Sequence, residues 1–409
     1  MPEPVVVTGL GIVSPVGVGV PAFAAALRAG ATGFRAVPDE AGGTRFAAPL
    51  TGFDLAAALA AATPGVRREA LRAARRSPLP VQAGVAAAVE AWQHAGLAGG
   101  AVPADRVGLI VGGHNLTGGY AFEHHPVYLR QPVYLPARYA LQVQDTDHVA
   151  TISQALGVTG EGHTVGASSA SGNLALIQAA RLIAAGAVDA CLAVGALARP
   201  APPERAALAN LGVLAPPAEP ACHPFDRRRA GLVPGEAAAC LVLEPAGAAR
   251  RRGATPLAEL AGVATGLDAT SLSTPSPAGE ERVMRQALAR AGVAPSAVDY
   301  VNAHGTATPA GDDAELAALA AVFGPARPWI NSTKGLVGHC LSAAGAVEAI
   351  ATVVQLRAGF VHANPGLRRP AAPGHRLVGA TAVPAPIEVA LSTSFGFGGF
   401  NTAVVLRRG

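Results

Sequence analysis

Charge and cysteine are both scarce in this sequence, and each shortage excludes a class of protein. Only 14% of the 409 residues are charged while 50% are hydrophobic, which excludes an intrinsically disordered chain and predicts a large core. Four cysteines are too few for a disulfide scaffold, and without a recognisable pattern they favour a reducing, cytoplasmic compartment. Glycine has no strict period and no long heptad run occurs, which excludes collagen-like and coiled-coil proteins.

Targeting and membrane signals are lacking as well. The N-terminus MPEPVVVTGLG has an acidic residue and no basic n-region, so no secretory signal is visible. The longest charge-free stretches, such as 390–406, contain glycine, serine, threonine and asparagine, which is typical of strands and turns and not of a membrane span. A net charge of +4 is compatible with an acidic partner but carries no clustered nucleic-acid signature. We therefore expect no contact with membrane or nucleic acid.

Buried strands alternate with helical segments, which predicts an α/β protein with a mostly parallel sheet. In the first half, strand-like runs occur at 5–9, 107–111, 190–194 and 238–243, and helical spacing occurs at 81–97 and 174–185. After Arg250 to Gly253 the plan repeats, with a strand and helices at 300–303, 314–323 and 343–357. The repeat suggests an internal duplication with halves at 1–250 and 251–409.

A segment at 112–150 looks inserted into the first half. It holds four of the five tyrosines, Tyr120, Tyr128, Tyr134 and Tyr139, and has little periodicity. Such a segment could cap a site, form a dimer contact, or be an ordinary ordered loop. Its cluster of Asp145, Asp147 and His148 resembles metal ligands, although we favour a structural role and expect no metal site.

The stretch TVGASSASG at Thr164–Gly172 precedes a helical pattern. A sharp strand-to-helix turn presents its side chain at a helix N-terminus, where backbone N–H groups and the helix dipole stabilise negative charge. Ser168, Ser169 and Ser171 are candidates for the presented side chain. They could equally be N-caps, a common role for serine.

Two further segments place histidines at glycine-rich junctions between strand and helix. They are NAHGTATPAGDDAE, which contains His304, and NSTKGLVGHCLSAAGAVE, which contains Lys334 and His339. In open α/β sheets such junctions lie where ligands bind. Lys334 is the only lysine in the chain, so this position could require a compact ammonium group, unless lysine remains there by chance. Neither histidine fits a zinc-ligand pattern.

The turn SFGFGGFN at Ser394–Asn401 lacks the features of a phosphate-binding loop. Its glycines would let the backbone approach a reacting centre, and the N–H of Phe397 could contribute to an oxyanion hole. The alternative is a tight turn that uses glycine only for its backbone angles.

Together these segments resemble the β-ketoacyl synthases of the thiolase fold, over nearly the whole chain. The resemblance rests on VVVTGLGIVSPVG, HPFDRRRAGLVPGEAA and the three segments around His304, His339 and Phe397. It implies an α/β protein with a duplicated five-layer α-β-α-β-α fold and a homodimer. It also implies that His304, His339 and Lys334 are catalytic, that Thr306 and Thr308 hold a pantetheine arm, and that Glu348 is a buried carboxylate behind them.

The sequence departs from this family at the nucleophile. The resemblance places Ser169 where the family has its cysteine, and none of Cys191, Cys222, Cys240 and Cys340 falls there. A serine hydroxyl is far less acidic than a thiol and needs an adjacent base to act as a nucleophile. We therefore expect acyl transfer and chain elongation to be crippled, while the two imidazoles can still stabilise the enolate left by decarboxylation of a malonyl thioester.

Free-standing decarboxylases of polyketide β-branching cassettes share this replacement, and the GASSASG and QDTDH stretches look like that subgroup. The resemblance implies conversion of malonyl to acetyl on an acyl carrier protein, without a cofactor beyond the carrier's phosphopantetheine. An enzyme resembling hydroxymethylglutaryl-CoA synthase would act downstream. A non-catalytic partner subunit like the chain-length factors, and an acyltransferase or esterase that uses Ser169, are the alternatives.

A basic ridge could recognise the carrier. Arg68, Arg72, Arg75 and Arg76 share one side of a helix if residues 66–76 are helical. Carrier proteins are acidic, so such a ridge would steer them towards the site. A solvated charged face is the alternative explanation.

Overall fold

Strands of the main sheet run through both halves of the chain. The computed structural model describes residues 3–39, 42–271 and 273–409. The strands of the main sheet are β1 Val5–Ser14, β2 Gly17–Val18, β5 Val107–Gly112, β6 Gly162–Val165, β7 Ala190–Gly195, β8 Ala238–Pro245, β9 Ala258–Leu267, β10 Tyr300–Asn302, β11 Trp329–Asn331, β13 Arg376–Leu377, β15 Val389–Gly396 and β16 Phe400–Arg408. Two small sheets pair β3 Arg35–Pro38 with β4 Thr44–Ala47, and β12 Phe360–Val361 with β14 Val383–Pro384.

The helices fall into three layers around this sheet. They are α1 Val20–Ala29, α2 Leu55–Ala58, α3 Pro64–Ala74, α4 Leu79–His94, α5 Gly118–Arg130, α6 Tyr139–Gln142, α7 Thr146–Leu156, α8 Ser171–Ala184, α9 Pro202–Asn210, α10 Ala246–Arg251, α11 Pro277–Ala291, α12 Pro309–Phe323, α13 Lys334–Val337 and α14 Ala344–Ala358. Short 3₁₀ turns are η1 Ala104–Arg106, η2 Pro132–Tyr134, η3 Pro295–Ala297 and η4 Leu341–Ala343.

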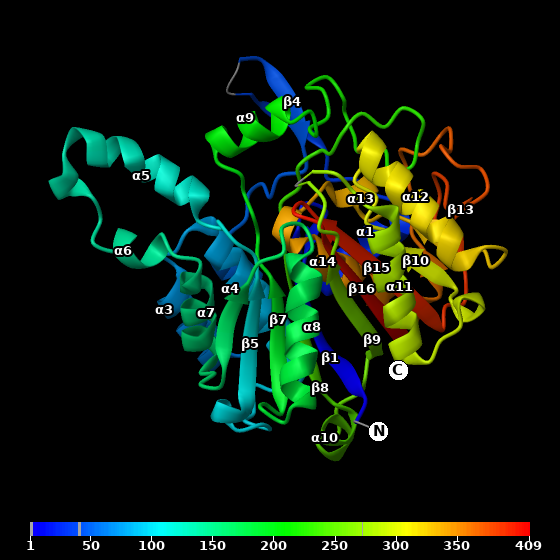
Figure 1. The fold of residues 1–409 in the computed structure, drawn as a ribbon. Coiled ribbons are helices and arrows are strands. Elements are labelled where there is room, and N and C mark those ends of the chain that lie inside the picture. The colour runs from blue at the N-terminus through cyan, green and yellow to red at the C-terminus, as the bar shows by residue number, and fades with distance from the viewer. Residues whose placement is uncertain (1–2, 40–41, 272) are drawn as a thin grey trace.

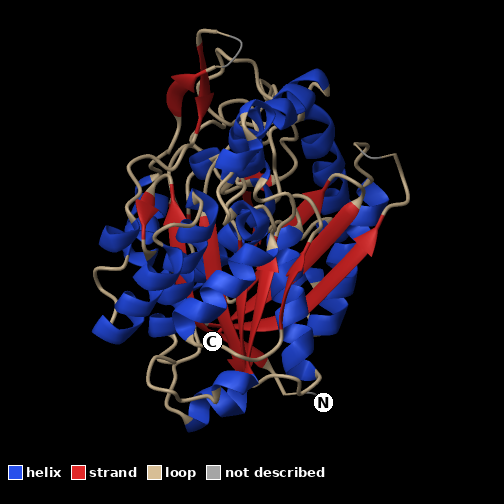
Figure 2. Ribbon diagram, turned by 90° about the vertical axis from the view of Figure 1, so that its left-hand side faces the viewer, coloured by secondary structure: helices blue, strands red, loops and turns tan. Residues whose placement is uncertain are grey.

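The strand order shows the duplication. One half runs β6-β5-β7-β8-β1 and the other β11-β10-β15-β16-β9, and β1 joins β9. In each half the first three strands are parallel and the next two are antiparallel. Helices α8 and α14 lie between the halves, α4 packs on the outer face of the first, and α11 and α12 cover the second (Figures 1 and 2). The architecture is therefore the expected five-layer α-β-α-β-α arrangement.

One expectation about the sheet was wrong. It is mixed and not mostly parallel, because β1, β8, β9 and β16 pair antiparallel at its centre. These strands are nearly continuously buried, for instance over all of β1. Continuous hydrophobic runs predict a strand that is covered on both faces, and such strands are commonest in parallel sheets. The runs do not indicate whether neighbouring strands are parallel or antiparallel. The predicted bounds of the two duplicated halves, 1–250 and 251–409, stay a prediction.

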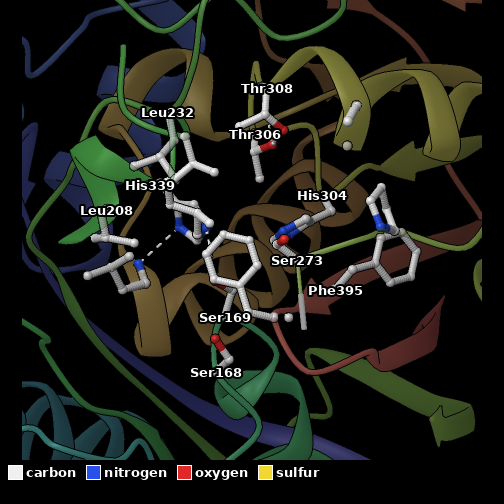
Figure 3. Close-up of a pocket in the computed structure, with 18 of the residues that line it drawn as sticks. Ser168, Ser169, Leu208, Leu232, Ser273, His304, Thr306, Thr308, His339 and Phe395 are labelled. Carbon is white, nitrogen blue, oxygen red and sulfur yellow. Dashed lines mark hydrogen bonds between the residues drawn. The ribbon is translucent and has the colours of Figure 1, made fainter. Parts of the chain in front are cut away.

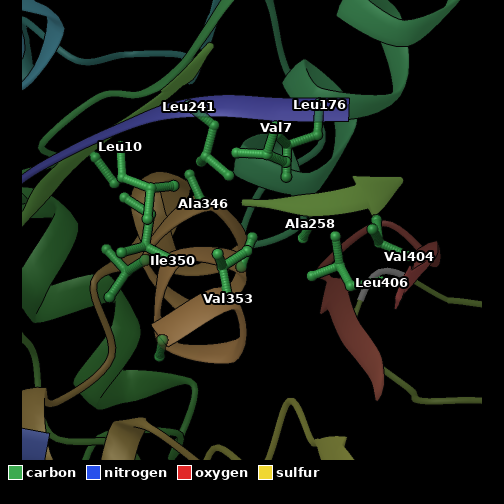
Figure 4. Packing of buried hydrophobic residues seen from close by; sticks show 14 of the residues in the cluster. Val7, Leu10, Leu176, Leu241, Ala258, Ala346, Ile350, Val353, Val404 and Leu406 are labelled. Carbon is green, nitrogen blue, oxygen red and sulfur yellow. The ribbon is translucent and has the colours of Figure 1, made fainter. Parts of the chain in front are cut away.

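The core gathers around α14. Its side chains Ala346, Ile350 and Val353 meet Leu10 of β1 and Leu176 of α8 among others (Figure 4). The span Leu341–Ala358 is apolar and long enough to cross a membrane by length and composition, yet 83% of it is buried inside the fold. A helix enclosed between two sheets needs this composition because both of its faces contact apolar neighbours.

The segment at 112–150 is largely helical. It forms α5, η2, α6 and the start of α7, and α5 and α6 extend away from the body of the molecule (Figure 1). Its exposed hydrophobic residues include Leu129, Val133 and Tyr134, which are 67%, 85% and 71% exposed. Such an apolar surface is typical of an interaction site, so the dimer contact stays a prediction for it.

Close packing between α8 and α14 gives the first testable prediction. A Cβ atom added to Gly172 would lie 2.5 Å from the backbone nitrogen of Ala346. Gly172→Ala should therefore lower the free energy of unfolding by about 1–3 kcal/mol, because the helices must move apart. Urea unfolding followed by circular dichroism measures the change.

Gly65→Ala is the matched control. Gly65 lies in α3, and a Cβ there would have no atom within 4 Å. Alanine is the better helix former by about 1 kcal/mol, so this variant should be as stable as the parent or more stable. Equal losses of stability in the two variants would contradict the packing argument.

Candidate active site

A cavity of about 700 Å³ brings the predicted segments together. It is lined by Ser168, Ser169, His304, Thr306, Thr308, His339 and residues 395–397, among others (Figure 3). Ser169 follows β6, His304 follows β10, and Phe397 follows β15. β5 and β6 are parallel, as are β10 and β15, so each pair presents its carboxyl ends together, and in such folds ligands bind at these ends.

The turn before α8 gives its three serines different roles. Ser171 Oγ accepts the N–H of Ala167 at 2.9 Å and donates to the carbonyl of Ser168 at 2.6 Å, so it holds the turn. Ser168 has a left-handed φ of 50°, which turns the chain sharply. Ser169 lies next to it with 9% of its surface exposed, and it lines the cavity.

His339 presents a hydrogen-bond donor to Ser169. Its Nδ1 accepts the backbone N–H of Leu341 at 3.0 Å, so a neutral imidazole must carry its proton on Nε2. Nε2 lies 3.1 Å from Ser169 Oγ (Figure 3). The N–H therefore donates to the serine oxygen, and His339 is not arranged as a base for the hydroxyl.

Lys334 fixes the second histidine in the same state. Its Nζ lies 3.1 Å from His304 Nδ1, donates to the His304 carbonyl at 2.6 Å, and pairs with Glu348. These contacts use all three ammonium protons. Because His304 Nδ1 accepts from Lys334, its remaining proton is on Nε2. The two imidazole rings lie 5.5 Å apart at 86°.

Both imidazoles are held neutral. Burial, and then the positive charge of Lys334, lower the pKa of His304 and of His339 well below 6.5. Burial raises the pKa of Glu348 to about 7, and Lys334 opposes that shift. The buried ammonium and carboxylate compensate each other, since an unpaired charge at this depth would be very unfavourable.

Glu315 is a structural partner that the sequence argument did not assign. Its carboxylate accepts the backbone N–H groups of His304 at 2.8 Å and Gly305 at 2.7 Å, and the hydroxyl of Thr393 at 2.8 Å. It thereby fixes the turn that carries the histidine. Glu315 ends the motif around His304, but no local pattern indicates that its side chain reaches back from α12 to this turn.

Another unassigned carboxyl group, Glu280 of α11, belongs to the cavity wall. Only 2% of its surface is exposed, and burial together with Glu315, Asp268 and Asp312 raises its pKa well above 4.5. No motif marked this position, because only folding brings α11 beside α12.

The remaining predicted site residues also border the cavity. Thr306 and Thr308 line it and share a hydrogen bond of 2.8 Å between their hydroxyl groups. Gly396 approaches the serine turn so closely that a Cβ would lie 2.4 Å from the carbonyl oxygen of Ala167. The glycine therefore permits this close approach, and the following residue, Phe397, lines the cavity together with Ser169. The role of the Phe397 N–H in an oxyanion hole stays a prediction.

The predicted carrier-docking ridge is helical and exposed. Arg68 and Arg72 lie in α3 with side chains 77% and 66% exposed, and each pairs with Glu69 between them. Arg75 and Arg76 follow the helix end. None of the lining residues comes from α3, so its role in docking stays a prediction.

Neither thiols nor metal ligands gather in the cavity. Cys191, Cys222, Cys240 and Cys340 are buried elsewhere, and burial raises the pKa of each thiol. Among residues 3–39, 42–271 and 273–409, no group of three or more histidine, cysteine or acidic side chains could hold a metal ion. Asp145 instead accepts the N–H of Leu116 at 2.8 Å.

Two family models match the chain in succession. Residues 2–249 match the N-terminal domain of β-ketoacyl synthases, and residues 257–368 match their C-terminal domain. The chain belongs to the β-ketoacyl synthase family.

Among individual relatives, it is 36% identical over 412 aligned residues to the polyketide biosynthesis malonyl-ACP decarboxylase PksF of Bacillus subtilis (strain 168), covering 100% of this chain and 97% of that protein. The ishigamide ketosynthase/chain length factor is similar in structure, with a TM-score of 0.90, 28% identity and full coverage of both chains. A ketosynthase solved in complex with its type II PKS acyl-carrier protein, AntDE:AntF, has a TM-score of 0.85, 27% identity and full coverage.

The protonation of the two histidines gives the second prediction. Both should stay neutral, with the proton on Nε2, as the pH falls through 6.5, because their folded pKa lies below that value. Isotope-labelled histidine followed by NMR reports tautomer and charge directly. The unfolded chain takes up these protons near pH 6.5, so the free energy of unfolding should fall as the pH drops below it. Titration of either ring near 6.5 would contradict the assignment.

Proposed function

We propose that this protein removes CO₂ from the malonyl group on an acyl carrier protein and leaves acetyl, without extending a chain. The observation that carries the proposal is a pair of imidazoles, those of His304 and His339, which lie 5.5 Å apart on the cavity wall with their protons on Nε2. The Nε2–H of His339 lies beside the Ser169 hydroxyl. Loss of CO₂ from a malonyl thioester leaves an enolate. Two preorganised neutral donors stabilise its oxygen in a buried site, where such interactions are strong.

The serine favours decarboxylation over condensation. By resemblance, Ser169 takes the place of the cysteine that carries the growing chain in elongating synthases. A serine nucleophile needs a base, yet His339 offers Ser169 an N–H. The likeness to PksF over the full chain supports the same activity here.

Lys334 acts through His304. It touches Nδ1 and the backbone carbonyl of that residue, so it sets both the tautomer and the position of the ring. Glu348 holds the ammonium in turn. Thr306 and Thr308 line the same cavity as the histidines, which supports a role in holding the pantetheine arm of the substrate. The phosphopantetheine belongs to the carrier, so the proposal includes no resident cofactor.

We also assign the partners by the same reasoning. The substrate is a malonyl-loaded carrier protein, in keeping with the carrier complex of a structural relative. The acetyl product would pass to an enzyme resembling hydroxymethylglutaryl-CoA synthase in β-branching. A homodimer through the exposed apolar arm α5–α6 completes the proposal.

The third prediction tests the chemistry. Incubation with malonyl carrier should yield acetyl carrier, and His304→Ala should lower the rate constant by roughly 10²–10³-fold, the usual effect of removing one such donor. Mass spectrometry of the carrier measures both species. An inert protein that becomes stable only with a second synthase would instead indicate a chain-length-factor-like partner subunit.

Ser169→Cys is the matched variant for the nucleophile. It restores a thiol beside an imidazole N–H and a helix N-terminus, where thiolates are stabilised. Intact-mass analysis should find acyl groups on the cysteine variant but not on the parent. Acyl-Ser169 in the parent would support an acyltransferase or esterase.

The fourth prediction concerns carrier docking. Arg68→Glu combined with Arg72→Glu should slow association with the acidic carrier and flatten its salt dependence, because α3 then repels the carrier. Stopped-flow measurements at several ionic strengths give the rate constants. Arg250→Glu, on α10, is the control with the same type of change away from α3. Unchanged association would remove α3 from the docking surface.

A further inference from the structure

The Ser169 hydroxyl has one hydrogen-bonding direction already defined. Its oxygen accepts the Nε2–H of His339 at 3.1 Å. Within the part of the chain that the structure describes, the side-chain oxygen has no other hydrogen-bond partner. The hydroxyl proton therefore points away from His339, and Ser169 lines the cavity.

His339 cannot take this proton. Its Nδ1 accepts the Leu341 N–H and its Nε2 already carries a hydrogen, so gaining the serine proton would require a free lone pair that the ring lacks. A donor that hydrogen-bonds to a hydroxyl oxygen polarises the O–H bond, which makes the group a better acid. The arrangement suits proton donation by Ser169 and not nucleophilic attack.

The hydroxyl also lies close to the reacting atoms. The enolate oxygen must come within hydrogen-bond reach of Nε2 of His339, the same atom that Ser169 contacts. Two acceptors that share one N–H are neighbours. The enolate carbon is two bonds from that oxygen, so it lies within reach of the hydroxyl proton of Ser169.

We propose that Ser169 is the catalytic acid that protonates the enolate carbon, an inference that rests on the proposed function. The bond between Cα and the carboxylate breaks, CO₂ leaves, and the bond's electron pair becomes the C=C bond of the enolate while the carbonyl π pair moves to the thioester oxygen. The C=C pair then forms the new C–H bond with the Ser169 proton, and the oxygen pair restores the thioester carbonyl. The serine oxygen recovers its proton from one water, which leaves as hydroxide.

Transfer of the proton from Ser169 to the enolate carbon is thermodynamically favourable. A carbon next to a thioester is a weaker acid than an alcohol, so the enolate carbon takes the proton. The alkoxide left on Ser169 is stabilised by the Nε2–H of His339 and by the N-terminus of α8, which begins two residues later. Serine thus takes a role that a thiolate, which carries no proton, cannot fill.

The stereochemical course tests the inference. Malonyl carrier with one deuterium of known configuration at Cα is decarboxylated in tritiated water, and the chirality of the acetyl methyl group is analysed. A fixed serine adds hydrogen to one face, so the parent should give one configuration. Ser169→Ala keeps both imidazole donors but lacks the acid, so it should release CO₂ more slowly and with loss of configuration, as water protonates the enolate from either side.

Ser169→Thr retains the hydroxyl and should retain the configuration. A single configuration from Ser169→Ala, or a racemic product from the parent, would overturn the role of Ser169 while leaving decarboxylation intact. Absence of CO₂ release from the parent would overturn the proposed function, and the inference with it.

Discussion

One buried ammonium group organises the site. Lys334 contacts the ring and the carbonyl of His304 and the carboxylate of Glu348, and so connects the turn after β10, the start of α13 and the middle of α14. Its side chain is 1% exposed, so none of these contacts is weakened by water. A guanidinium group could not be substituted here, because its planar fork does not fit three acceptors around a single nitrogen.

The same charge determines what chemistry the cavity supports. Burial removes the solvent that would otherwise favour imidazolium, and the Lys334 charge lowers the pKa of both histidines further, so both rings stay neutral. Neutral rings with their Nδ1 atoms occupied can only donate from Nε2. A site built from two donors and a hydroxyl stabilises negative oxygen, whereas it offers no base to activate a nucleophile.

Backbone strain gathers at the same place. Ser168, Phe225, Ala307 and Leu341 are non-glycine residues with positive φ, and each belongs to a turn at or beside the cavity wall. Buried carboxylates compensate for this strain: Glu315 holds the turn of His304, and Asp312 accepts the N–H groups of Phe225 at 2.6 Å and Ala307 at 3.0 Å. Rigid turns hold the residues that carry the two donors in place, which is the basis of preorganisation.

Element types, the fold family and the segments that form the cavity could all be predicted from the amino-acid sequence. Strand periodicity, glycine turns and the motifs around Ser169, His304 and His339 are local, and local patterns depend on neighbouring residues alone. Three other features depend on residues that are distant in the chain, so only folding sets them. They are the directions of the strands, the contact of Glu315 with the His304 turn, and the placement of Glu280. The tautomers belong to this second group: the Leu341 N–H and the Lys334 ammonium, brought into position by folding, decide which nitrogen carries the proton.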